Sequence, residues 1–192
     1  MKKIMFNDKY GLTKAVLEGR KTMTRRVVPE KLLEAYYDYD DYVNAVAPRD
    51  IPCSREYEKE FFLRRSPFKA CEVVAVAQAY RDAINPLDWV NTLIYKYEPG
   101  WTNKMFVGAD LMPHQIFINA VRVERLQDIS DEDCLKEGVF LGQFHTYSYV
   151  GRPRCPFGTP REAFASLIDR ISGKGTWKSN PWVFVYEFEL VK

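Results

Sequence analysis

The chain has little of what metal sites and membrane spans require. Its 192 residues include two histidines and four cysteines, and no two cysteines stand at CxxC spacing. We therefore expect no structural zinc site, no other metal and no cofactor. No secretory signal is evident, so we expect reduced thiols and a cytoplasmic location. Because no apolar run approaches the roughly 20 residues that span a bilayer, we expect no membrane partner.

The excess of charge of either sign is also small. Lysine and arginine number 28 against 26 acidic residues, a net charge of +2. No overall basic field attracts nucleic acid, so any affinity for phosphate must come from a local patch. Hydrophobic residues make up 46% of the chain, enough for a packed core. Aromatic residues make up 15%, and an exposed share of them can stack on bases.

The densest local signal is the stretch Gly19–Arg26, GRKTMTRR, which holds four cations and two hydroxyls. It follows a short helical pattern with Leu12, Ala15 and Val16 on one face, and Gly19 suits the helix end. Arginine presents a planar fork of donors that matches phosphate. Threonine is a nucleophile only if a neighbour takes its proton, and lysine is a base only where burial or cations lower its pKa. The alternative interpretation is a solvated, basic strand end.

Five segments have the apolar patterns of strands: residues 3–6, 22–27, 72–79, 115–126 and 182–191. In the fourth segment the apolar phase shifts, which predicts a bulge near Asn119 or Ala120. Helices are predicted after Phe6, Ser130 and Thr159. The sequence thus predicts an α+β protein in which these strands form one small mixed β-barrel with flanking helices.

Two segments between these strands are predicted to be insertions. Residues at about 30–68 contain an acidic, tyrosine-rich tract and several prolines, and we expect a partly helical, partly looped excursion. The sequence pattern at about residues 85–98 predicts a helix capped by Asn85. Its buried face is predicted to hold Leu87, Val90 and Ile94.

Three separated segments resemble the ASCH superfamily. Val16–Arg26 resembles its opening signature, Asp128–Gly138 its short acidic helix, and residues 180–189, NPWVFVYEFE, its closing strand. The resemblance covers residues 1–28, 70–139 and about 164–191. It implies one PUA-like β-barrel domain over residues 1–192, carrying both insertions, whose partner is RNA or a modified nucleoside or nucleotide.

The resemblance also implies two alternative roles for particular residues. In the binding alternative, cations line a cleft for the ligand and Trp101 stacks on a base, although Trp101 fits a core position equally well. The cleft cations are Arg20, Lys21, Arg25, Arg26 and Lys104. In the enzyme alternative, which follows a small bacterial branch that hydrolyses the N4-acetyl amide of acetylcytidine, Lys21 is the base, Thr24 the nucleophile and Glu137 the acid. A ribonuclease is a third function within the same superfamily.

One strand departs from the family pattern. Where many relatives carry an arginine and a glutamate, the aligned positions hold Ala77 and Gln78. Any ligand contact that this pair makes in relatives is not expected here.

Overall fold

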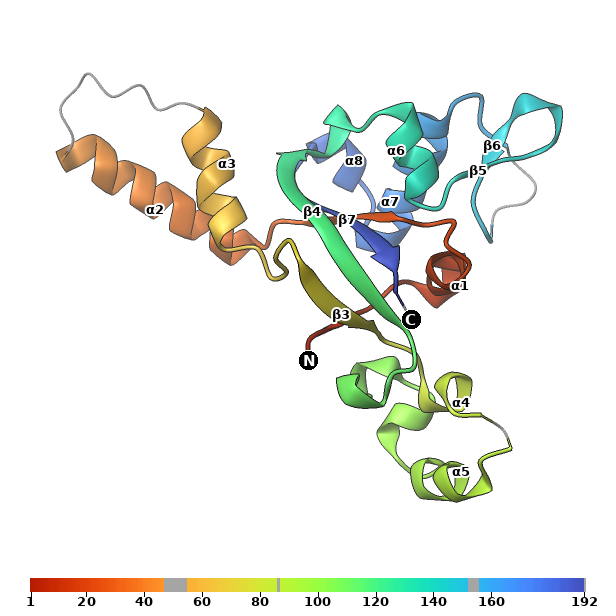
Figure 1. Ribbon diagram of the computed structural model, residues 1–192. Helices are drawn as coiled ribbons and strands as arrows, with labels where there is room; N and C mark the ends of the chain where they lie inside the picture. Colours follow the sequence, from red (N-terminus) through yellow and green to blue (C-terminus); the bar gives the residue numbers. More distant parts are fainter. Residues whose placement is uncertain (47–54, 86, 152–155, 192) are drawn as a thin grey trace.

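The computed structural model describes residues 1–46, 55–85, 87–151 and 156–191 and has a mixed α+β architecture (Figure 1). Its strands are β1 (Lys3–Ile4), β2 (Met23–Val27), β3 (Glu72–Val76), β4 (Gln115–Arg125), β5 (Phe140–Leu141), β6 (Tyr147–Ser148) and β7 (Trp182–Leu190). Its α-helices are α1 (Leu12–Leu17), α2 (Glu30–Val46), α3 (Arg55–Arg64), α4 (Tyr80–Ala83), α5 (Trp89–Tyr95), α6 (Asp131–Lys136), α7 (Pro160–Ser172) and α8 (Thr176–Ser179). Short 3-10 helices are η1 (Asp8–Tyr10), η2 (Pro99–Trp101), η3 (Lys104–Phe106), η4 (Ala109–Leu111), η5 (Leu126–Asp128) and η6 (Gln143–His145).

The five predicted strands form one sheet in the order β1-β3-β4-β7-β2. The pair β1–β3 is parallel and the other neighbouring pairs are antiparallel. The register between β4 and β7 shifts between Ile118 and Ala120, so the predicted bulge is confirmed. The long strands β4 and β7 form the centre of the sheet, and β5 and β6 make a separate small hairpin.

Both faces of β7 are buried from Trp182 to Tyr186, where successive side chains alternate between two cores. Phe184, Tyr186 and Phe188 pack in one cluster with residues of β1, β3 and α1. Val183 and Val185 pack in a second cluster with the apolar stripe of α7. The helices predicted after Phe6, Ser130 and Thr159 are present as α1, α6 and α7.

The sheet is open, in contrast to the barrel that the sequence predicts. Strands β1 and β2 are its two edges, and within the described residues no backbone ladder joins them. β1 has two residues, and the chain then turns into η1, where the Asn7 side chain accepts a hydrogen bond from the Lys9 amide. Instead of a ladder, the Arg26 guanidinium donates a hydrogen bond to the Met5 carbonyl. This gap between the two edges, which we call the seam, positions the site described below.

The first insertion consists of α2 and α3, which extend away from the sheet (Figure 1); its residues 47–54 lie outside the described residues. Helix α3 anchors this arm through Phe62, whose ring lies 6.1 Å from that of Trp182, centroid to centroid.

The second insertion differs from the prediction. Helix α5 begins at Trp89, and its cap is Asp88, which accepts a hydrogen bond from the Asn91 amide. The predicted buried face is wrong, since Leu87, Val90 and Ile94 are 87%, 47% and 57% exposed. The helix belongs to a small outlying lobe (Figure 1) that is anchored through the Tyr80 and Tyr95 rings, so the sheet never covers this face. Among the described helices, none has both the length and the apolar character needed to cross a bilayer.

Candidate functional site

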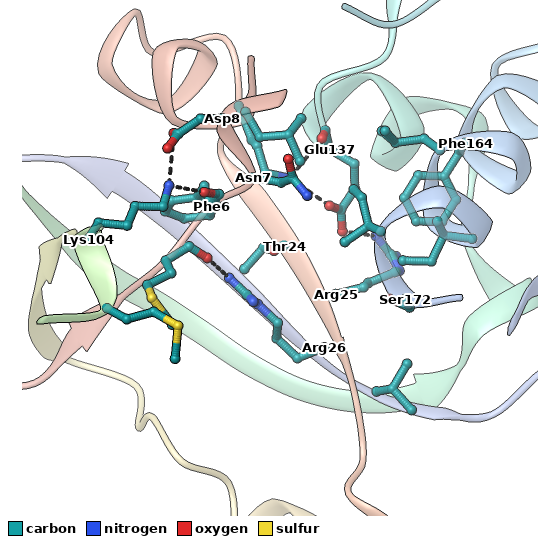
Figure 2. A pocket seen from close by; sticks show the side chains of 18 of the residues that line it. Phe6, Asn7, Asp8, Thr24, Arg25, Arg26, Lys104, Glu137, Phe164 and Ser172 are labelled. Atoms are coloured by element: carbon teal, nitrogen blue, oxygen red, sulfur yellow. Dashed lines mark hydrogen bonds and ion pairs between the residues drawn. The ribbon is translucent and has the colours of Figure 1, made fainter. Parts of the chain in front are cut away.

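A pocket of about 430 Å³ lies at the seam (Figure 2). One wall comes from the chain that follows β1 and from η3, and the other from β2, the end of α6 and α7. Six of the eight predicted site residues border it: Lys21, Thr24, Arg25, Arg26, Lys104 and Glu137. Because β2 is an edge strand, side chains from both of its faces reach the same pocket.

The turn after α1 directs Lys21 inward. Gly19 has the left-handed φ of 69° that ends the helix, and the Arg20 and Lys21 amides both donate to the Ala15 carbonyl. Lys21 is 2% exposed, and its Nζ donates to the Met23 carbonyl, the Glu137 carbonyl and Glu137 Oε2, each at 2.7 Å. An ammonium has three protons, so this set satisfies all of them.

Glu137 is held at the end of α6, which begins at the Ser130 cap. The residue is 4% exposed, and its carboxylate accepts from Lys21 at Oε2 and from Arg25 Nη1 at Oε1, the latter at 3.2 Å. Burial lowers the pKa of Lys21; Glu137 opposes that shift, while Arg26 and Arg25 add to it. Burial and the Glu137 carboxylate therefore act on the pKa of Lys21 in opposite directions, and burial has the larger effect.

The guanidinium of Arg25 donates hydrogen bonds to three carboxylates. Its guanidinium donates to Glu124 Oε1 at 2.9 and 2.6 Å and to Asp133 Oδ2 at 2.8 Å, besides the contact to Glu137. Burial alone would lower the pKa of Arg25, but these three carboxylates outweigh it and raise the pKa. Arg25 therefore stays charged and braces the pocket wall rather than presenting free donors.

Arg26 differs from the other cations of the pocket. Within the described part of the chain it makes no ion pair, and its buried Nε has no hydrogen-bond partner. Its guanidinium lies 5.8 Å from the centre of the Phe6 ring. Burial lowers its pKa, and Glu137 and Tyr186 oppose that shift. Arg26 therefore borders the pocket as a cation that no described carboxylate neutralises.

Lys104 closes the opposite side of the pocket (Figure 2). Its Nζ donates to the Phe6 carbonyl, to Asp8 Oδ1 at 2.8 Å and to Thr13 Oγ1 at 3.1 Å, so its protons are also used. Thr24 lies between Lys104 and Glu137 in this view and is 5% exposed. No described residue forms a hydrogen bond with the Thr24 hydroxyl, which leaves that group free for a ligand.

Two predicted residues lie elsewhere. Arg20 is exposed, and its guanidinium pairs with Glu18 outside the pocket. Trp101 packs against the buried cluster around Tyr80 and Met112, which is the core alternative for this residue.

Sequence reasoning missed Asn7 and Asp8 as pocket residues because no pattern distinguishes them from an ordinary turn. The sequence also gave no sign that Phe164 and Ile168 border a pocket.

Among the described residues, no three histidine, cysteine or acidic side chains come together as metal ligands would. Cys71 is an exposed free thiol and Cys134 a buried one, whereas Cys53 and Cys155 lie outside the described residues. Comparison of the chain with protein-family models, with curated proteins and with solved structures finds no match in any of the three.

Proposed function

We propose that this chain is a PUA-like protein of the ASCH type that binds RNA, or a modified nucleoside or nucleotide, in the seam pocket. The observation that carries the proposal is the meeting of Lys21, Thr24 and Glu137 at one pocket. These residues come from two stretches more than a hundred positions apart, and the sequence resemblance implies the same three residues as a set. The proposed PUA-like relationship requires that the open sheet be a barrel interrupted at its seam.

The size and lining of the pocket fit a ligand of nucleoside size. About 430 Å³ lies within the range of small-molecule sites, which combine apolar walls with a few polar groups. Apolar walls come from Phe6, Leu12, Phe164, Leu167 and Ile168. Among the described lining residues, the Thr24 hydroxyl has no hydrogen-bond partner, and Arg26 has no carboxylate partner although its guanidinium donates to the Met5 carbonyl. A planar base can pack against the apolar walls while its polar edge meets these two groups.

The charge balance favours one nucleotide unit over a long phosphate backbone. Lys21, Arg25 and Lys104 are already paired with carboxylates of the protein. Only Arg26 among the pocket cations lacks such a partner in the described chain. A ligand that brought several phosphates would have to break these buried pairs.

The alternative is hydrolysis of an N4-acylated cytidine-type nucleoside. It is favoured by the lowered pKa of Lys21 and by the free Thr24 hydroxyl. In this mechanism neutral Lys21 takes the Thr24 proton, Thr24 Oγ1 attacks the acyl carbon, and the leaving amine receives a proton from Glu137. Water then cleaves the resulting acyl ester.

The contacts of Lys21 favour binding over this alternative. All three Nζ protons are donated to Met23 and Glu137, and no hydrogen bond joins Lys21 to Thr24. A base must lie within hydrogen-bond reach of the proton that it abstracts. The ribonuclease function has no support beyond the family resemblance.

Calorimetric titration with cytidine, N4-acetylcytidine and cytidine 5′-monophosphate tests the binding proposal. We expect Thr24→Val and Arg26→Gln each to weaken binding about tenfold, the equivalent of about 1.4 kcal/mol. The matched control is Arg20→Gln, which removes a neighbouring arginine outside the pocket and should leave affinity unchanged. Absence of binding to all three compounds and to short RNA would refute the proposal, as would equal effects of Arg20→Gln and Arg26→Gln.

A further inference from the structure

Within the described chain, strand β2 pairs with a neighbour on one side only. Just before the strand, the Phe188 amide donates to the Thr22 carbonyl. Just after it, the Val28 amide donates to the Trp182 carbonyl, and the register between these two bonds is unbroken. In an antiparallel pair every second residue bonds to the partner strand. The even-numbered residues of β2 therefore direct their main-chain groups toward β7, and the odd-numbered ones direct theirs toward the seam.

Arg25 and Val27 consequently present unpaired main-chain groups to the seam. Both residues border the seam pocket, and no group in the described part of the chain bonds to their N–H or C=O. The Arg25 side chain is 1% exposed whereas the whole residue is 5% exposed, so most of its accessible surface is main chain. Backbone donors and acceptors in folded proteins are nearly always paired. These groups therefore form a polar edge of the pocket that favours a ligand able to pair with them.

The free edge is too short for an added strand. At one end the Met23 carbonyl already accepts from Lys21 Nζ, and at the other end Pro29 has no N–H. Between these ends the Arg26 guanidinium crosses the seam to the Met5 carbonyl. Strand addition forms a ladder of main-chain bonds, whereas this edge offers one acceptor between two donors. It therefore suits a small ligand with a donor and an acceptor side by side.

The pocket has apolar walls from both faces of the sheet. Phe6 and Leu12 belong to the core on one face, and Phe164 and Ile168 belong to the core on the other. In the view of Figure 2, Phe6 and Phe164 lie on opposite sides of Thr24. A flat ring that meets the β2 edge in the plane of the sheet is thus covered by apolar side chains on both of its faces.

We propose that the free edge of β2 binds the Watson–Crick edge of one unpaired base, free or in a single-stranded segment. The Arg25 C=O accepts a hydrogen bond from the base, and a flanking N–H, of Arg25 or Val27, donates one to it. This inference rests on the proposed function and narrows its ligand class. Thr24 and Arg26 flank Arg25 in the strand, so the ligand groups that their side chains bind lie next to this edge.

The chemistry of the bases fits such an edge. Every base places a hydrogen-bond donor next to an acceptor on its Watson–Crick edge. Cytosine presents N4–H beside N3, and uracil presents N3–H beside O4. In a paired base these groups are occupied, and a base with methyl groups in place of the hydrogen has lost the donor. One acyl group on N4 of cytosine leaves one N4–H, so an acylated cytidine remains compatible.

Calorimetric titration with methylated nucleosides tests the proposal. N3-methyluridine is compared with its isomer 5-methyluridine, and N4,N4-dimethylcytidine with 5-methylcytidine, because the 5-methyl group lies away from the Watson–Crick edge. We expect each compound that lacks the edge hydrogen to bind at least about tenfold more weakly than its 5-methyl counterpart. This ratio should persist in Arg26→Gln and Thr24→Val, although both variants bind all of these compounds more weakly, because the preference comes from the main chain.

NMR of the full chain identifies the main-chain groups. The tighter of the two 5-methyl nucleosides should shift the Arg25 or the Val27 amide proton downfield and slow its exchange with solvent. The amide protons of Thr24 and Arg26 are the internal control and should change little, since they already bond to β7.

Three results would overturn this assignment while leaving nucleoside binding intact. They are equal affinity for the methyl isomers of uridine where these bind, loss of the preference in Arg26→Gln or Thr24→Val, and unchanged Arg25 and Val27 amide protons at saturation. The failure of the proposed function looks different, since no nucleoside would then bind and no amide proton of β2 would respond.

Discussion

The ammonium of Lys21 and the carboxylate of Glu137 form an ion pair of 2.7 Å between side chains that are 1% and 5% exposed. Burying such a pair removes the hydration of both charged groups, and this penalty offsets most of their attraction. The pair therefore contributes little to the free energy of unfolding when it is compared with two apolar side chains of similar size. Removing one partner is different, because the other charge is then left buried and unpaired. This relationship decides which substitutions can test the site.

Lys21→Met and Glu137→Gln should each destabilise the fold by about 3–5 kcal/mol, because each leaves a buried group without its partner. The double variant Lys21→Met/Glu137→Gln, which combines the same two substitutions, should lose less than the sum of the two single effects. Urea unfolding measures all three. The control is Lys14→Met, which breaks an exposed pair with Glu18 and should cost under about 1 kcal/mol. If Lys21→Met costs no more than Lys14→Met, the pair is not buried in solution.

The local features of this fold could be predicted from the sequence because they depend on nearby residues. Alternating apolar side chains predicted the strands, and the phase shift after Ile118 predicted the bulge. The turn at Gly19 likewise follows from the helix end before it. These features require no knowledge of what the segments pack against.

The open seam and the charge state of the basic stretch depend on distant contacts. The stretch Gly19–Arg26 is basic as a sequence, but Glu124 and Asp133 neutralise Arg25 from other elements. The contact from Arg26 to Met5 replaces the ladder that would close a barrel, and no local pattern encodes it. The exposed face of α5 was mispredicted for the same reason, since periodicity shows which residues share a face but not whether anything covers that face.

Binding of a short single-stranded RNA should depend weakly on salt. Each phosphate neutralised contributes a slope of about −0.7 in log K against log salt, and Arg26 is the pocket cation without a carboxylate partner. We expect a slope near −0.7 for the wild type, a slope near zero for Arg26→Gln and an unchanged slope for Arg20→Gln. Fluorescence titrations at several salt concentrations measure it. A slope several times steeper would mean that Lys21, Arg25 or Lys104 also exchanges its carboxylate partner for a phosphate of the RNA.

Alkylation should separate the two described thiols. Cys71 is exposed, whereas Cys134 is fully buried and burial raises its pKa from 9.0 to about 12. Iodoacetamide at about pH 8 should modify Cys71 and spare Cys134 until urea unfolds the chain, as peptide mass spectrometry can show. Modification of both at similar rates in the folded state would contradict the burial of Cys134.

The same thiol makes stability depend on pH. The unfolded chain releases the Cys134 proton near pH 9, whereas the folded chain holds it up to about pH 12. The stability present below pH 9 is therefore lost as pH rises through this window, by up to about 1.4 kcal/mol per pH unit. Cys134→Ala should reduce the loss measured by urea unfolding between about pH 8 and pH 10. An identical pH dependence in wild type and variant would exclude this contribution.

Incubation with N4-acetylcytidine decides between a binding protein and an amidohydrolase. We expect binding without release of acetate, because Lys21 donates all three protons elsewhere and makes no hydrogen bond to Thr24. Release of acetate by the wild type would contradict this and favour the enzyme. Thr24→Val should then abolish turnover while keeping the melting temperature, since it preserves shape and removes only the hydroxyl. The rate should rise with pH through the lowered pKa of Lys21, because the base acts only when its amine is neutral. If turnover survives Thr24→Val, a water molecule is the nucleophile that attacks the acyl carbon, and Thr24 takes no part in the reaction.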